Sequence, residues 1–329
     1  MNRRFFLAGL AGVVATAATG VALGRRRRDT ANVLRVGVMA NLTHAPMLAG
    51  LGSGRIARAL APTVIESRVF RAGPRVTEAL IGDAIDVGTT GPAPAIIHHA
   101  RHAAGSGGRG GLRILAGCAS GGASLVVTRR SRVRSADDLH GKRLAVTQIG
   151  TTQDLSLRTY LAEHALRDAS AGGDVRVIAV AAATILAQMR SGELDGAWLP
   201  EPWATRVVRE LGAERFIDER DLWEGRRFSS AVLVARADRA ADARVTRLAQ
   251  ALAEEVARAN RDPARTRDEA YEELGRRVGN PGSRGDFDAA WVFLEATSDP
   301  LRASVEELGR RARSVALLPA SATLDGLFS

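Results

Sequence analysis

The chain has 329 residues, of which 46% are hydrophobic and 25% charged, proportions typical of a globular protein large enough for two lobes. Its net charge of +10 rests mostly on residues 1–28, which hold six arginines and no acid, so that 40 basic and 36 acidic residues remain in the rest. Without a basic and aromatic motif of the known kinds, nucleic-acid binding is disfavoured, and the single cysteine, Cys118, excludes an internal disulfide and a thiolate metal site.

The first 30 residues have the pattern of an export signal. The order R-R-x-F-L at residues 3–7 resembles the twin-arginine signal, and a moderately apolar stretch continues to Leu23. Glycine and alanine in that stretch weaken the case for a permanent membrane span. An uncleaved N-terminal anchor stays open for residues 1–30, because no clear cleavage site follows and the four arginines at 25–28 are an unusual flank. We expect the protein to be exported, to the periplasm or the cell surface.

The body of the chain alternates predicted strands and helices. The predicted strands are residues 34–38, 64–70, 85–88, 143–147, 175–180, 195–199 and 228–235, and the predicted helices are 74–82, 153–166 and 184–191. Residues 112–128 hold two apolar runs interrupted by glycines, which fits one kinked strand or two strands joined by a crossing segment. From about 241 to 313 the pattern is helical, with breaks at Pro263, Pro281 and Pro300. This alternation predicts an α/β protein with mostly parallel sheets.

Four times a predicted strand runs into a short polar or glycine loop that opens a helix. The segments are LRVGVMANLTHAPM, AIDVGTTGPAPAII, RLAVTQIGTTQDLS and LDGAWLPEPWATRV. A helix start presents free backbone N–H groups and the positive end of the helix dipole. Several such starts aimed at one cleft can hold a small anion without a metal or covalent chemistry. The pattern therefore favours a protein that captures a solute over a catalyst.

The loop Gln148–Gln153 has the strongest local signal of the four. Thr151 followed by Asp154 resembles a capping box, and Gly150 lets the backbone approach a ligand closely. A plain helix cap with no ligand explains the same residues.

The segment Pro200–Trp203 ends a strand with a carboxylate and an indole held by two prolines. Trp203 offers a flat apolar wall and one N–H donor, and Glu201 offers a charge. The alternative is a core tryptophan beside an ordinary acid in the first turn of a helix.

The histidines and the carboxylates give little sign of catalysis. His98, His99 and His102 form an H-H-x-x-H run, but no nearby acid or cysteine completes a zinc site, so a solvated helix end is the simpler interpretation. His44 in the first loop could donate to an anion or support a helix cap. The chain has no G-x-S-x-G elbow and no Ser–His–Asp spacing. We expect no enzyme, no metal and no cofactor.

In this order the segments resemble the sulfonate/nitrate/taurine family of solute-binding proteins of ABC importers, over about residues 33–235. The match is carried by FRAGPRVTEALIGDAIDVGTTGPAPAI (70–96), GCASGGASLVV (117–127), DDLHGKRLAVTQIGTTQDLSLRTYL (137–161), GELDGAWLPEPWATRVV (192–208) and DERDLW (218–223). The resemblance implies a periplasmic-binding fold of type II, with two hinged α/β lobes and two crossing strands. Lobe I would comprise 33–118 and 228–329, and lobe II 119–227.

The resemblance also implies which loops would bind the ligand. Carried over by position, the ligand residues are Asn41, Thr43, His44, Thr90, Gly91, Pro92, Ser120, Gly121, Gly150, Thr151, Thr152, Gln153, Glu201 and Trp203. These loops contain no Arg or Lys, so backbone N–H groups, hydroxyls and His44 would hold an anion, which suits a sulfonate. Glu201 would repel an anion, or it would bind the amine of a zwitterion such as taurine.

The predicted function is therefore that of an exported, monomeric solute-binding protein that serves an ABC permease and its ATPase and captures a small organic anion, first of all an aliphatic sulfonate. Nitrate, taurine and a pyrimidine or other thiamine precursor stacked on Trp203 are the alternatives within the fold. From another class, a thiamine-pyrimidine synthase-like enzyme is disfavoured, because that activity goes with a cysteine-rich motif. A cytoplasmic regulator would need a DNA-binding module, where this chain has an export signal.

Overall fold

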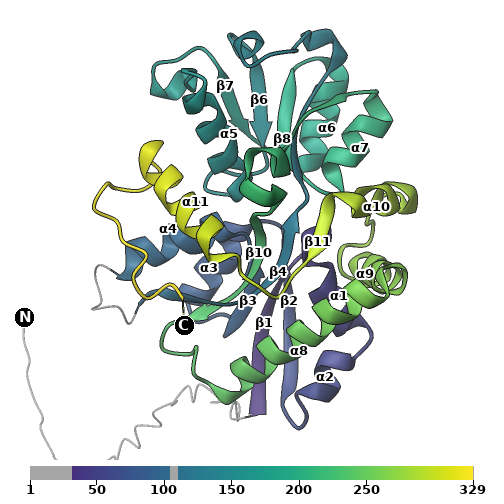
Figure 1. Cartoon of the computed structure of the whole chain (residues 1–329). Helices are drawn as coiled ribbons and strands as arrows, with labels where there is room; N and C mark the ends of the chain where they lie inside the picture. Colours follow the sequence, from purple (N-terminus) through teal and green to yellow (C-terminus); the bar gives the residue numbers. More distant parts are fainter. Residues whose placement is uncertain (1–31, 104–109, 329) are drawn as a thin grey trace, which may run out of the picture. The chain divides into compact units, whose positions relative to one another are not determined.

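The computed structural model describes residues 32–103 and 110–328 (Figure 1). The predicted export signal or anchor at residues 1–30 lies outside the described residues. Within the described ranges, no helix combines the length and the hydropathy that a membrane crossing requires.

The larger lobe is built on a six-stranded sheet with the order β11-β4-β10-β3-β1-β2. Its strands are β1 (Val33–Met39), β2 (Val64–Phe70), β3 (Val87–Thr90), β4 (Leu112–Gly121), β10 (Ser229–Arg236) and β11 (Leu294–Ala296). Its helices are α1 (Ala45–Gly52), α2 (Arg55–Ala59), α3 (Gly73–Ile81), α4 (Pro92–Ala103), α8 (Ala243–Arg261), α9 (Pro263–Val278) and α11 (Arg302–Ser314). Strand β3 is buried on both faces, as expected for a strand between helical layers, whereas β2 at the sheet edge is largely exposed.

The smaller lobe is built on a five-stranded sheet with the order β7-β6-β8-β5-β9. Its strands are β5 (Ala123–Val127), β6 (Arg143–Val146), β7 (Arg176–Ala179), β8 (Gly196–Pro200) and β9 (Glu214–Asp218). Helices α5 (Thr152–Glu163), α6 (Ala182–Ser191) and α7 (Trp203–Leu211) cover its faces, and α10 (Arg284–Ala290) contacts α7. Most of the predicted elements are confirmed with boundaries that differ by one or two residues.

Each sheet combines parallel and antiparallel pairs, and most of its strands run in one direction. The strand–helix–strand units give parallel pairs, β1 with β2 and β3, and β6 with β7 and β8. Strands β5 and β10, each of which follows a crossing between the lobes, and the edge strand β11 run the other way, so that they form antiparallel pairs with β3, β4, β8 and β9. A strand that enters a sheet from the other lobe has no crossover helix to make it parallel.

The chain crosses from the larger to the smaller sheet between β4 and β5. Of the two alternatives for residues 112–128, the structure has two strands, one in each sheet, separated by Gly122. Gly121 and Gly122 have φ values of 77° and 76°, a conformation that favours glycine. A Cβ at Gly121 would also lie 2.5 Å from the carbonyl oxygen of Phe293. The return crossing runs through residues 219–228, before β10, which itself lies in the larger sheet.

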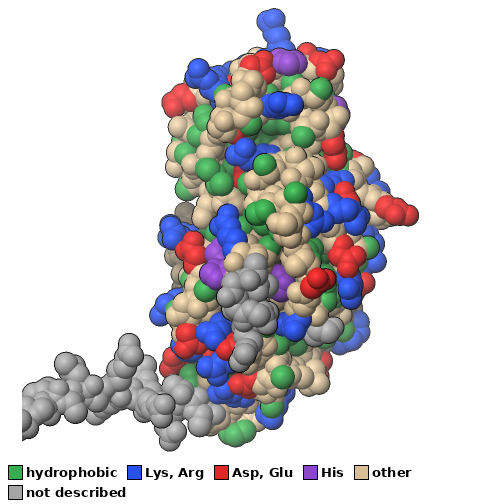
Figure 2. Space-filling view, turned by 90° about the vertical axis from the view of Figure 1, so that its left-hand side faces the viewer, with side chains coloured by type: hydrophobic (Ala, Val, Ile, Leu, Met, Phe, Trp, Pro, Cys, Tyr) green, Lys and Arg blue, Asp and Glu red, His purple; other side chains and the backbone are tan. Residues whose placement is uncertain are grey.

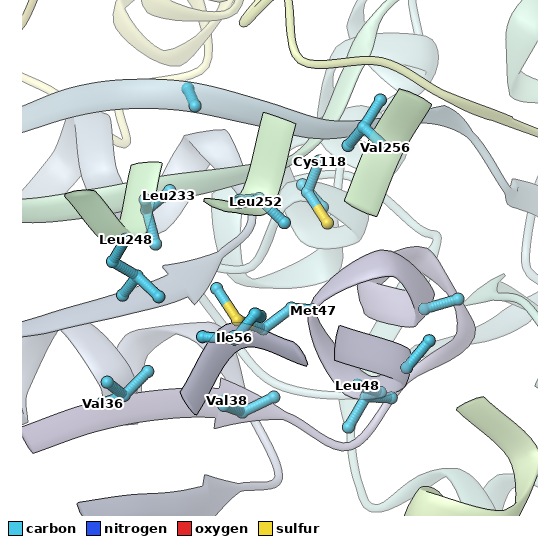
Figure 3. Close-up of a cluster of buried hydrophobic side chains, with 14 of the residues drawn as sticks. Val36, Val38, Met47, Leu48, Ile56, Cys118, Leu233, Leu248, Leu252 and Val256 are labelled. Atoms are coloured by element: carbon cyan, nitrogen blue, oxygen red, sulfur yellow. The ribbon is translucent and has the colours of Figure 1, made fainter. Parts of the chain in front are cut away.

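Apolar cores fill both faces of each sheet. In the larger lobe, one core lies under α1, α2, α8 and α9 and the other under α3, α4 and α11 (Figure 1). Figure 3 shows part of the first of these cores, with Met47 and Ile56 facing Leu248 and Leu252 of α8. Cys118 is fully buried in the same core, where it packs as a small hydrophobic residue. In the smaller lobe, the two cores lie under α5 and under α6 and α7.

The C-terminal region is helical with breaks at the three predicted prolines. Pro263 begins α9, Pro281 lies between α9 and α10, and Pro300 precedes α11. The short strand β11 was not predicted. It pairs with the end of β4, at the crossing between the lobes.

Candidate functional site

A cavity of about 560 Å³ lies between the two lobes. Its larger-lobe wall is formed by the β1–α1 and β2–α3 connections and the start of α4, and its smaller-lobe wall by the β6–α5 and β8–α7 connections and the start of α6. The end of α9 and the α9–α10 connection add a third wall from the C-terminal region. This volume is within the range of sites for small organic ligands.

Helices of eight or more residues begin at this cavity from both lobes. No side chain caps the first turns of α1, α3 and α6, whereas in the first turn of α7 the N–H of Thr205 donates to the carboxylate of Glu201. The first N–H groups of a helix have no partner within the helix. The uncapped starts therefore bring backbone donors and the positive ends of helix dipoles to the cavity wall, which is a suitable environment for an anion.

His44 lies in the wall with only 3% of its surface exposed. Its Nδ1 has no hydrogen-bond partner among the described residues, and burial lowers its pKa to about 3. The imidazole is therefore neutral at ordinary pH and offers one N–H donor without a charge. His44 occupies the N-cap of α1, but its side chain makes no capping bond, so the alternative of a cap-supporting histidine is wrong.

Two arginines line the cavity, although the predicted ligand loops contain none. Arg71 lies in the β2–α3 connection, is exposed, and has no hydrogen-bond or ion-pair partner within residues 32–103 and 110–328. Arg206 donates to Glu210 at 2.5 Å, and its guanidinium lies 5.2 Å from the centre of the Trp203 ring. Sequence inspection missed Arg71 because β2–α3 was not counted among the strand–loop–helix segments, although FRAGP has that pattern.

The C-terminal region contributes a carboxylate to the same cavity. Asp286 of α10 lines it, and Arg209 of α7 donates to Asp286 at 2.9 Å. Among the described lining residues, the acidic group and Arg206 are thus both paired, and Arg71 is the charged side chain without a counter-ion. The cavity has an unneutralised positive charge.

The structure brings eight of the predicted ligand residues to the cavity wall. They are Asn41, Thr43, His44, Gly91, Thr151, Thr152, Gln153 and Trp203. Thr151 accepts from the N–H of Asp154, so the predicted cap of α5 is present.

The other six predicted residues lie outside the lining: Thr90, Pro92, Ser120, Gly121, Gly150 and Glu201. Ser120 accepts from the N–H of Phe228, and Gly121 pairs with β11 at the crossing. Thr90 is fully buried, and the N–H of Gly150 donates to Asp154. Ser120, Gly121 and Gly150 thus serve the local fold, whereas the hydroxyl of Thr90 has no hydrogen-bond partner among the described residues.

Glu201 is the clearest departure from the expectation. It is fully buried, it accepts from Arg215 at 2.7 Å, and it accepts from the N–H of Thr205 at 3.0 Å. Burial raises its pKa, and Arg215 and Thr205 oppose that rise. Because the carboxylate is already satisfied by β9 and α7, it neither repels an anion in the cavity nor binds the amine of a zwitterion there.

The two lobes touch at the cavity through the starts of α4 and α5. The hydroxyl of Thr152 accepts from the N–H of Ala93 at 3.4 Å. A Cβ at Gly91 would lie 2.6 Å from the same hydroxyl, so glycine allows this close approach.

The histidine run in α4 does not form a metal site. His99 is buried, its Nδ1 accepts from the N–H of Leu112 at 3.2 Å and its Nε2 donates to the backbone oxygen of Asp325 at 3.0 Å, while His98 and His102 stack with ring centres 6.1 Å apart. The interpretation as a solvated helix end is therefore wrong for His99, which ties α4 to β4 and to the C-terminal segment. Across the described residues, no group of three or more His, Cys, Asp or Glu side chains could hold a metal ion.

The surface also carries no dominant charge on the face in Figure 2. Basic and acidic side chains are interspersed there. Many arginines of the described chain are paired with carboxylates, for example Arg55 with Glu255 and Glu269.

Comparisons with known proteins agree with this architecture. A model of the NMT1-like family matches residues 29–274, and no curated protein matches the chain at a significant level. Among solved structures, the periplasmic aliphatic sulphonate binding protein SsuA from Escherichia coli has a TM-score of 0.72 at 19% identity, over 90% of this chain and 91% of that one.

Two further structures are similar to the same extent. The alkanesulfonate-binding protein SsuA from Xanthomonas axonopodis pv. citri, bound to MOPS, has a TM-score of 0.73 at 20% identity, over 91% of this chain and 98% of that one. The periplasmic nitrate-binding protein NrtA from Synechocystis PCC 6803 has a TM-score of 0.73 at 17% identity, over 88% of this chain and 83% of that one. The predicted fold, two α/β lobes of the periplasmic-binding type, is confirmed.

Proposed function

The chain belongs to the NMT1-like family, and from that premise we propose that it is the solute-binding component of an ABC importer that captures a small organic anion. The observation that carries this proposal is the cavity between the lobes. The uncapped starts of α1, α3 and α6, the buried neutral His44 and the unpaired Arg71 converge on it. Because donors of this kind lie on both walls, they favour a bound anion, and an anion held by both walls in turn favours a closed arrangement of the lobes.

The mechanism is reversible, non-covalent capture. Backbone N–H groups from the larger lobe and the smaller lobe would donate to the same solute, so that binding links the two walls. The helix starts need no proton transfer and no metal for this task. The part of the cavity wall that includes Thr152 and Gly91 already lies in contact across the lobes.

The similar solved structures support a role in transport. Two of them are described as sulfonate-binding and one as nitrate-binding proteins. By analogy, this chain would be exported, through its twin-arginine-like segment, and would deliver its solute to a membrane permease driven by an ATPase. We expect it to act as a monomer and without a cofactor. An aliphatic sulfonate is the first candidate, with nitrate, taurine and a pyrimidine as alternatives.

The placement of Glu201 favours simple sulfonates over taurine. Glu201 is paired with Arg215, and Asp286 is paired with Arg209. The described lining residues therefore include no unpaired carboxylate that could bind an ammonium group. Ethanesulfonate should therefore bind at least as well as taurine.

Thermal-shift measurements on the full chain test the proposal. Alkanesulfonates, MOPS, taurine, nitrate and pyrimidines are compared, and a true ligand raises the melting temperature by mass action. A matched neutral compound, propanesulfonamide, controls for binding that does not need the charge. A result in which no anion raises the melting temperature, up to millimolar concentration, contradicts the proposal.

A Gly91→Leu variant supplies the structural control. Its side chain would enter the space that the Thr152 hydroxyl occupies, so that α4 and α5 could no longer approach. Binding should be lost while the variant stays folded by circular dichroism. If the variant binds the same anion with unchanged affinity, capture does not occur in this cavity.

A further inference from the structure

The cavity is larger than a small inorganic anion or taurine requires. Its volume of about 560 Å³ lies in the middle of the range for sites that bind ligands with many heavy atoms. Such sites bury most of the surface of their ligand. An ion with a few heavy atoms would leave most of this space to water. The solute should therefore extend beyond its charged group.

The lining outside the helix starts is mainly apolar. Leu274 and Val278 of α9 and Met39 of β1 line the cavity from the larger lobe. Prolines from both walls and the Trp203 indole add rigid apolar surface, and the lining prolines are Pro94, Pro200, Pro202 and Pro281. Rigid surface of this kind matches a rigid apolar partner better than a flexible polar one.

The charge and the indole lie on opposite walls. Arg71 belongs to the β2–α3 connection of the larger lobe, and Trp203 begins α7 in the smaller lobe. A solute that contacts both must carry its negative charge at one end and its apolar part at the other. The guanidinium of Arg206, which donates to Glu210, lies over the Trp203 ring at 5.2 Å from its centre.

We propose that the solute is an anion with an apolar body about the size of an aromatic ring, such as an arylsulfonate, whose head is bound by Arg71 and whose body lies against Trp203. This inference rests on the proposed function and narrows it. Arg71 is then the residue that selects the charge, and Trp203 the residue that selects the body. Nitrate and taurine are poor ligands because they have a charged group but no apolar part that could contact Trp203.

Isothermal titration calorimetry on the full chain tests this class. The probes are methanesulfonate, taurine and nitrate as heads without a body, p-toluenesulfonate and naphthalene-2-sulfonate as heads with a body, and p-toluenesulfonamide as a body with a neutral head. Burial of about 100 Å² of ring surface predicts that p-toluenesulfonate binds about 50-fold tighter than methanesulfonate. Loss of the charge predicts at least a tenfold weaker affinity for the sulfonamide.

Two variants assign the ends of the solute. Arg71→Met should weaken p-toluenesulfonate and methanesulfonate alike, by about tenfold, because it removes a contact with the charged head. The matched control Arg68→Met removes an exposed arginine of β2 that is not part of the cavity lining and should leave both affinities unchanged. Trp203→Ala should remove most of the advantage of the aryl probes, and Trp203→Phe should restore part of it.

The outcomes separate this inference from the proposed function. If methanesulfonate, taurine or nitrate binds as tightly as the aryl probes, the solute class is wrong and the solute-binding function stands. The same holds if p-toluenesulfonamide binds as well as p-toluenesulfonate, or if neither Arg71→Met nor Trp203→Ala changes the affinity. If no probe binds at all, with or without a ring, the proposed function itself fails.

Discussion

Glu219 is a buried carboxylate in the smaller lobe, just after β9, with 1% of its surface exposed. Ser156 donates to its Oε1 at 2.5 Å, and the indole N–H of Trp198 donates to its Oε2 at 2.7 Å. Burial outweighs these two neutral donors and raises the pKa of Glu219 from 4.5 to about 7. At mildly acidic pH the folded protein therefore retains a proton that the unfolded chain has released.

The sign of the pH dependence follows from that proton. Between pH 4.5 and about 7 the folded state binds more protons at Glu219 than the unfolded state, so its contribution to stability falls as the pH rises. For this shift, linkage gives a loss of about 2.5 kcal/mol between pH 5 and pH 8. Glu219→Gln keeps the shape and can still pair with Ser156 and Trp198, but it cannot ionise. When the pH is raised from 5 to 8, the free energy of unfolding of the variant should therefore increase by about 2.5 kcal/mol relative to that of the wild type.

Urea unfolding followed by far-ultraviolet circular dichroism measures this difference. Backbone dichroism is preferable to tryptophan fluorescence, because Trp198 contacts the mutated group directly. His44 has the opposite pH dependence, since its lowered pKa makes stability rise with pH, but it is present in both proteins and cancels. The matched control is Glu224→Gln, an exposed acid of the same lobe. If the variant and the wild type differ in their free energy of unfolding by the same amount at pH 5 and at pH 8, the raised pKa of Glu219 is refuted.

Three further predictions concern stability and reactivity. Burial raises the pKa of Cys118 to about 12, so a thiol reagent should label the protein only after denaturation, and rapid labelling at pH 8 without urea would contradict this. Gly117→Ala should lower the free energy of unfolding by about 1–3 kcal/mol, because the new methyl group would overlap the backbone of Asp299, and unchanged urea unfolding would disprove the overlap. Arg215→Met should destabilise by about 3–5 kcal/mol, because it leaves Glu201 buried without a counter-ion, and the double variant Arg215→Met/Glu201→Leu should recover much of that loss in the same urea assay.

The strand–helix alternation of the fold could be predicted because it depends on local patterns. The strands β1, β2, β6, β7 and β8 were found from their apolar runs, and the C-terminal helix breaks from their prolines. Strand β11 was missed because its partner is the end of β4, more than 170 residues earlier in the chain. Strand direction depends on the same distant pairings. A sequence pattern shows that a segment is extended, but not which neighbour it joins.

The site could be predicted in part for a similar reason. A strand that runs into a helix start is a local feature, and the loops of Asn41–His44 and Thr151–Gln153 line the cavity as that feature suggests. The orientation of Glu201 could not be predicted, because it depends on Arg215 of another strand. Arg71 could not be predicted, because its loop has no capping residue. The α9–α10 connection could not be predicted either, because nothing in its sequence indicates contact with the smaller lobe. The lobe boundaries at 118/119 and 227/228 stay a prediction.

The contacts between the lobes differ in kind on the two sides of the cavity. On the side of α10, the ion pair of Arg209 and Asp286 joins α7 to α10, and its arginine is half exposed, while Arg215 lies 3.6 Å from the ring centre of Phe293 just after α10. Such an ion pair contributes about 1 kcal/mol or less, because water replaces it when it breaks. On the side of α11, Leu155 of α5 is fully buried against larger-lobe residues, and Arg311 stacks 4.3 Å from the Trp223 ring centre. Exposure of a leucine alone costs about 1.5–3 kcal/mol, so separating α7 from α10 costs less than separating α5 from α11.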